Sequence, residues 1–143
     1  MRTFGSVLLG YITLFVLVFV SYTVLYSALG EDGAFIAKSY AVSTPWLTVS
    51  LGLSFLSALI AGILTNKMGG DDASIWLLVV IVLLGIALGV MNLGAPPAGE
   101  RSASVPPMEA MAKAVTPAWA TFVNSALTAI GSAVGWKLAK PKR

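Results

Sequence analysis

Four long apolar segments alternate along the chain with short stretches that hold its charged residues. None of the four carries a charge before its last turn. A helix needs about 20 apolar residues to cross the hydrocarbon core of a bilayer, and lipid offers backbone groups no hydrogen-bond partners. The pattern therefore predicts an all-α integral membrane protein, a bundle of four transmembrane helices. These helices are expected at about residues 5–29, 45–65, 73–93 and 117–138.

The stretches between these segments complete a single membrane domain over residues 1–143. The second outer stretch contains Met108, Met111, Ala112 and Val115 at helical spacing, which predicts a short helix on the membrane surface or on the bundle. A few turns with no special role would give the same pattern. In chain order we expect an outer loop at 30–44, an inner turn at 66–72, an outer loop at 94–116 and a basic tail at 139–143.

The distribution of Lys and Arg predicts the orientation. With the N-terminus inside, six of the nine basic residues lie on the inner side, which favours cytoplasmic termini by the positive-inside rule. The first apolar run is longer than the core of a signal peptide and lacks a clean cleavage site, so we expect it to be retained. Tryptophans near the predicted helix ends are expected to anchor the helices at the membrane interfaces. They are Trp46, Trp76, Trp119 and Trp136.

An aromatic stripe follows one face of the first segment. Its residues are spaced by three or four positions, which places them in a row on a helix. The stripe can bind a partner helix or the apolar body of a quinone, carotenoid or pigment, or it can be ordinary packing inside the bundle. The residues are Tyr11, Phe15, Phe19, Tyr22 and Tyr26.

Small and polar residues form faces on the other three segments. In lipid, such faces let helix backbones approach closely, so they are expected to serve helix packing or contact with a partner. Asn124 is either a hydrogen-bonding link between helices or a contact to a ligand or partner chain. The second and fourth segments echo each other in sequence, which is compatible with two related hairpins or with chance. The faces comprise Ser50, Ser54, Ala58, Gly62, Gly85, Gly89, Asn124, Thr128, Gly131 and Gly135.

Composition restricts the chemistry. The hydrophobic fraction is 57%, the charged fraction is 10%, and the sequence contains no histidine or cysteine. The commonest metal ligand and general base is therefore missing, and no charged group lies inside a segment where a proton relay would need one. The scattered basic residues do not form a nucleic-acid-binding face. No catalytic, metal or cofactor site is predicted, although a bound lipid, quinone or carotenoid is compatible with the aromatic stripe.

These observations favour a non-enzymatic accessory or structural subunit of a larger complex in the cell (inner) membrane. The partners expected are the lipid bilayer and either other membrane subunits or further copies of the chain. The alternative is a passive channel or small-solute permease formed by oligomerisation, with the Ser, Thr and Asn side chains lining a path. An intramembrane enzyme is disfavoured because no acid–base pair lies in any segment.

Overall fold

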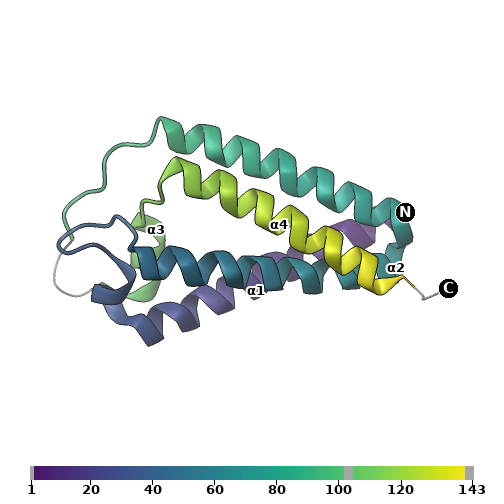
Figure 1. Cartoon of the computed structure of the whole chain (residues 1–143), viewed down its shortest axis with the longest axis horizontal. Helices are drawn as coiled ribbons and strands as arrows, with labels where there is room; N and C mark the ends of the chain where they lie inside the picture. The colour runs from purple at the N-terminus through teal and green to yellow at the C-terminus, as the bar shows by residue number, and fades with distance from the viewer. Residues whose placement is uncertain (1, 102–104, 141–143) are drawn as a thin grey trace.

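The computed structural model describes residues 2–101 and 105–140, and within them it is all-helical. Lys142 and Arg143 of the predicted basic tail lie outside the described residues. The helices lie lengthwise side by side, apart from one short helix at an end of the bundle (Figure 1). They are α1 (Arg2–Ala34), α2 (Thr44–Leu93), α3 (Pro107–Lys113) and α4 (Ala118–Ala139).

Helix α2 contains two of the predicted segments and the turn between them. Gly70 interrupts it with φ 73° and ψ −161°, a backbone conformation that glycine adopts at little cost. The chain reverses at this point (Figure 1), so α2 is a helical hairpin. We call residues 44–69 its first arm and residues 71–93 its second arm. The first arm begins at Ser43, whose hydroxyl accepts a hydrogen bond from the Trp46 backbone N–H.

The chain therefore runs the length of the bundle four times. The start of α1, the reversal of α2 at Gly70 and the end of α4 lie at one end, which we call the termini end (Figure 1). The segments at 35–43, 94–101 and 105–117, the last of which includes α3, lie at the other, which we call the loop end. Short backbone bridges join these two segments: Tyr40 N–H donates to Gly99, and Val115 N–H donates to Tyr40.

Two separate apolar clusters form the core. The first lies in the middle of the bundle and joins Leu14 of α1 to Ala58, Leu77 and Ile81 of both α2 arms. The second lies at the loop end, where the rings of Tyr26 and Trp46 meet edge to face. The remaining members of the loop-end cluster are Leu25, Ala34, Phe35, Tyr40, Val42, Val105 and Ala110.

Helices α1 and α2 are long and apolar enough to be candidate membrane spans. Their most apolar 18-residue windows have mean hydropathies of 2.3 and 2.8. Among the described helices, α4 does not reach the same level, because its sequence is rich in Ala, Gly, Ser and Thr. Its length of 22 residues is that of a span.

Candidate functional site

Close backbone-to-backbone contacts join α4 to the first arm of α2. A Cβ added to Gly62 would meet the Ser132 backbone, and one added to Gly135 would meet the Leu59 carbonyl oxygen. The missing side chains therefore let the two helices approach backbone to backbone. Ser132 is itself buried in this contact.

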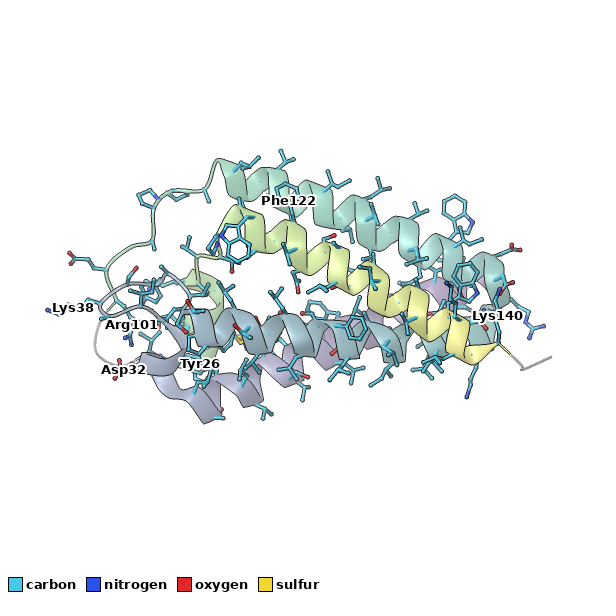
Figure 2. All side chains as sticks on the ribbon, in the orientation of Figure 1. Tyr26, Asp32, Lys38, Arg101, Phe122 and Lys140 are labelled. Atoms are coloured by element: carbon cyan, nitrogen blue, oxygen red, sulfur yellow. The ribbon has the colours of Figure 1, made fainter. Side chains whose placement is uncertain are left out.

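The second arm of α2 meets α4 on its other side. Gly85 lies against the Ser125 side chain, and Gly89 lies under the ring of Phe122 (Figure 2). Towards the loop end, Asn92 Nδ2 donates a 2.7 Å hydrogen bond to Thr121 Oγ1. Helix α4 is thus held along its length by both arms of α2.

Helix α1 is held differently. At the termini end, Gly10 lies against Thr65 and Leu77, so that α1 touches both arms of α2. Gly69 also lies close to Ser6 there. Within the described residues, however, no Cα atom of α1 lies within 8 Å of one of α4. Helix α1 therefore packs against α2 without reaching α4.

A cleft of about 230 Å³ lies between α1, α4 and the two arms of α2. Its floor includes Ser54 of the first arm, and its walls come from α1, the second arm and α4. Two wall residues, Phe15 and Leu88, are 63% and 55% exposed, so the cleft reaches the outer surface of the bundle. The lining is Tyr11, Leu14, Phe15, Val18, Ser54, Ile81, Leu84, Gly85, Leu88, Thr121, Asn124, Ser125 and Thr128.

Among the residues that line the cleft, one buried polar atom has no hydrogen-bond partner. Asn124 Oδ1 is buried, and no described residue donates to it. The neighbouring polar groups are already paired: the Thr128 hydroxyl donates to the Asn124 backbone carbonyl at 2.7 Å, and Ser54 Oγ lies 2.8 Å from the Tyr22 hydroxyl. Buried polar atoms in proteins are nearly always hydrogen-bonded, and this oxygen is an exception that water-sized groups in the open cleft do not reach.

The structure divides the predicted aromatic stripe into two groups. Tyr22 and Tyr26 turn into the loop-end cluster, where each contacts the Trp46 ring edge to face. Phe15 and Phe19 are exposed, with their rings stacked 6.4 Å apart, and Tyr11 lines the cleft with Phe15. The stripe is therefore not one continuous surface, and its role as a partner face stays a prediction.

The predicted small-residue faces lie between helices. Ser50, Ser54, Ala58 and Gly62 are buried on the first arm, Gly85 and Gly89 on the second arm, and Thr128, Gly131 and Gly135 on α4. The four tryptophans do not share one environment: Trp46 is buried in the loop-end cluster, Trp76 and Trp119 are exposed, and Trp136 is half-buried.

Charged side chains gather at the two ends of the bundle, as the labelled residues in Figure 2 illustrate. At the loop end, Arg101 donates to Glu31 at 2.9 Å and to Asp32 at 3.1 Å, with its side chain only 6% exposed. Glu31 also accepts from the Val105 backbone N–H at 2.7 Å. This network ties the second loop to the end of α1, and the adjacent Tyr26 hydroxyl donates to the Val105 carbonyl.

A smaller network closes the termini end. Asp71 accepts hydrogen bonds from Trp136 Nε1 at 2.7 Å, from Lys140 Nζ at 3.0 Å and from Asn66 Nδ2 at 3.2 Å. The bonds from Trp136 and then Lys140 stabilise the carboxylate and lower the pKa of Asp71 below its ordinary value. The contact joins the Gly70 reversal to the end of α4.

The described residues contain no group of three acidic, His or Cys side chains that could hold a metal ion. No known protein family, curated protein or solved structure matches the chain. The candidate site therefore rests on geometry alone. Sequence reasoning identified Tyr11, Phe15, Ser54, Gly85, Asn124 and Thr128 among its lining residues, and it missed Leu14, Val18, Ile81, Leu84, Leu88, Thr121 and Ser125.

The missed residues gave little signal in the sequence. Apolar side chains such as Leu84 and Leu88 look alike whether they face lipid, a neighbouring helix or a cavity. The loop-end network was also missed as a unit, although Arg101 is the one arginine between residues 3 and 142 and two acidic residues end α1. The sequence alone could have suggested that this arginine pairs with Glu31 and Asp32.

Proposed function

We propose that the chain crosses the cell (inner) membrane four times, through α1, the two arms of α2 and α4. The arrangement of charge supports this proposal: residues 3–30, 39–66, 73–99 and 114–136 contain no Asp, Glu, Lys or Arg. The middle of the bundle is thus free of the groups that are costly in hydrocarbon. Large apolar side chains are exposed along the same length, among them Phe4, Leu83 and Ile130. Lipid is the solvent that suits such a surface.

In this proposal the termini end faces the cytoplasm. Arg2, Lys67, Lys137 and Lys140 lie there, four of the seven Lys and Arg residues that the structure describes, whereas Lys38, Arg101 and Lys113 lie at the loop end. The chain has no cysteine, so Lys38→Cys and Lys67→Cys each introduce a single reactive thiol. A membrane-impermeant maleimide on intact cells should label the Lys38→Cys variant only. Labelling of Lys67→Cys instead would reverse the orientation, and labelling of both would refute the four-span arrangement.

Within the membrane, we propose that the protein is a non-enzymatic accessory subunit of a larger complex. The observation that carries this proposal is the sparse packing of α1. Only 11% of its most apolar window is buried, against 28% for α2. The exposed face of α1 carries Leu8, Ile12, Phe15 and Phe19 at helical spacing. A large apolar ridge of this kind fits the small-residue groove of a partner helix.

Site-specific crosslinking tests the proposed partner face. A photoreactive amino acid at Ile12 lies on the exposed face of α1, and one at Leu83 lies on the exposed face of the second α2 arm as a matched control. In native membranes we expect the Ile12 variant to crosslink to a distinct membrane protein and the Leu83 variant to crosslink mainly to lipid. Crosslinking to lipid alone from both positions, with a lone species in mild detergent, would exclude the accessory role.

A channel receives less support from the geometry. The hydroxyl groups expected to line it are mostly buried between helices and donate to carbonyls of their own helix, as Thr65 does to Ala61 and Thr128 does to Asn124. These groups are therefore already satisfied within the fold and do not require a row of water. Solute flux in liposomes, lost on replacement of Thr128 by Leu, would restore the channel as the better proposal.

A further inference from the structure

The lining of the cleft repeats one pattern on three helices. On each wall the lining residues stand at positions i, i+3, i+4 and i+7, which form one face of a helix over two turns. The cleft is therefore a slot that runs along the helices. The walls are Tyr11, Leu14, Phe15 and Val18 on α1, Ile81, Leu84, Gly85 and Leu88 on the second arm of α2, and Thr121, Asn124, Ser125 and Thr128 on α4.

The dimensions of the slot fit one extended hydrocarbon chain. A helix rises about 10 Å between positions i and i+7, so the slot is about 10 Å long. Dividing its volume of about 230 Å³ by that length gives a mean cross-section of roughly 20 Å². Carbon atoms in contact lie about 3.5–4.0 Å apart, so this cross-section holds one row of carbon atoms, and two rows side by side need about twice the area.

The chemistry of the slot suits an apolar occupant. Its α1 and second-arm walls are apolar except for the hydroxyl group of Tyr11. The hydroxyl groups of Ser54, Thr121 and Thr128 already have hydrogen-bond partners within the protein, and Asn124 Oδ1 is closed to the open space. Apolar cavities stay dry and bind apolar molecules, as an engineered cavity of about 150 Å³ in another protein does with benzene.

The position of the slot along the bundle assigns its occupant to one membrane leaflet. One edge of the slot, at Leu88 and Thr121, lies about 5–8 Å from the loop end of the second arm and of α4. The other edge, at Ile81 and Thr128, lies about 15–17 Å from the opposite ends of the same helices. In the proposed embedding, the slot therefore belongs to the leaflet at the loop end.

We propose that the slot binds one acyl chain of a phospholipid whose headgroup lies at the loop end of the bundle. Phe15 and Leu88 line the slot and are exposed, so the chain enters sideways from the bilayer between them and runs toward Ile81. Because α1 does not reach α4, the bound chain supplies packing contacts between these two helices. The inference rests on the membrane embedding proposed above but not on a partner subunit.

Photoreactive phosphatidylcholine in nanodiscs that contain the full-length protein tests the proposal. A diazirine in the middle of the acyl chain should label Leu14 and Ile81, which line the slot and are only 7% and 5% exposed, so that a lipid outside the slot does not reach them. The same probe should label Leu83, which is 61% exposed and lies outside the lining. Labelling of Leu83 without Leu14 and Ile81 would overturn the proposed site, whereas labelling of none of the three would refute the membrane embedding itself.

A matched pair of variants shows whether the labelling depends on entry into the slot. Leu88→Trp adds bulk at the opening and should lower the labelling of Ile81 about tenfold, with the labelling of Leu83 unchanged. Leu83→Trp adds the same bulk on the same arm, outside the lining, and should leave the labelling of Ile81 unchanged. Both positions are exposed, so both variants should fold. Labelling of Ile81 that survives in Leu88→Trp would overturn the proposal.

A second probe, with the diazirine close to the headgroup, tests the leaflet. In a lipid whose headgroup lies at the loop end, this probe should label Leu88 and Thr121 in place of Ile81. The reverse order, with Ile81 labelled by the probe near the headgroup and Leu88 by the mid-chain probe, would place the lipid in the opposite leaflet and overturn the assignment to the loop end.

Discussion

The close contact between α4 and the first arm of α2 makes a quantitative prediction for Gly62→Ala. The new Cβ would lie far inside the 3.0 Å that real Cβ atoms keep from backbone atoms, against the carbonyl of Ser132. Neither backbone can rotate away as a side chain could, so the helices must separate by about 1 Å. A gap of that size removes about a quarter to a half of the dispersion energy of the atoms beside it.

The expected loss of stability follows from two opposing terms. Overpacking of this kind costs about 1–3 kcal/mol, and the better helix propensity of Ala returns up to about 1 kcal/mol. With the full propensity gain, the net destabilisation is therefore between about 0 and 2 kcal/mol, and the difference from a glycine that gains only the propensity is about 1–3 kcal/mol. Gly52→Ala is the matched control: it lies on the same helix with nothing within 4 Å of its added Cβ, so only the propensity gain applies.

Reversible unfolding in mixed micelles, titrated with sodium dodecyl sulfate and followed by tryptophan fluorescence, measures both variants. Gly62→Ala should unfold at a lower detergent fraction than the unchanged protein, and Gly52→Ala at an equal or higher one. If Gly62→Ala is as stable as Gly52→Ala, the two helix backbones are not in contact at Gly62 and the packing described for α4 is wrong.

Three further predictions concern the two ends of the bundle. Arg101→Leu should lower the free energy of unfolding by about 2 kcal/mol because it removes the buried cation that pairs with the partly buried Glu31, whereas the exposed Lys38→Leu should change it little in the same titration. Tyr26→Phe should cost about 1 kcal/mol through the lost hydrogen bond to the Val105 carbonyl, measured in the same way. The pKa of Asp71 is lowered in the folded state, so its contribution to stability is present above pH about 4 and is lost as pH falls through the folded value. Acid titration of Asp71→Asn should therefore show a shallower loss of stability below pH 4 than the unchanged protein, and an identical acid limb would contradict the described hydrogen bonds.

The helical class of the protein could be read from its sequence because apolar run length is a strong signal. The prediction of an all-helical chain is confirmed for the described residues, and α1 and α2 are apolar enough to be spans. The reversal at Gly70 also left a trace, since two glycines and two aspartates interrupt the apolar pattern there. Membrane embedding, the four spans and their orientation stay predictions.

The cleft was harder to predict because it depends on how closely the helices approach. Helix α4 packs backbone to backbone on α2, whereas α1 does not reach α4. The spacing of small residues at Gly62, Gly131 and Gly135 indicates a close approach but does not name the partner helix. The exposed Phe15 and the half-buried Tyr22 belong to one aromatic row, and only the path of α1 in space separates them. A cleft that lies between α1, α4 and the two arms of α2 produces no pattern of its own in a single sequence.

In the membrane embedding proposed above, lipid fills the cleft. The cleft opens at the outer surface of the bundle, and without an occupant its apolar lining lacks the dispersion contacts that packed atoms make. Helix α1 cannot simply collapse onto α4 to remove the void, because Gly10 fixes it at the termini end and the Arg101 network fixes it at the loop end. Lipid chains that enter the cleft from the side would supply most of these contacts to its apolar lining.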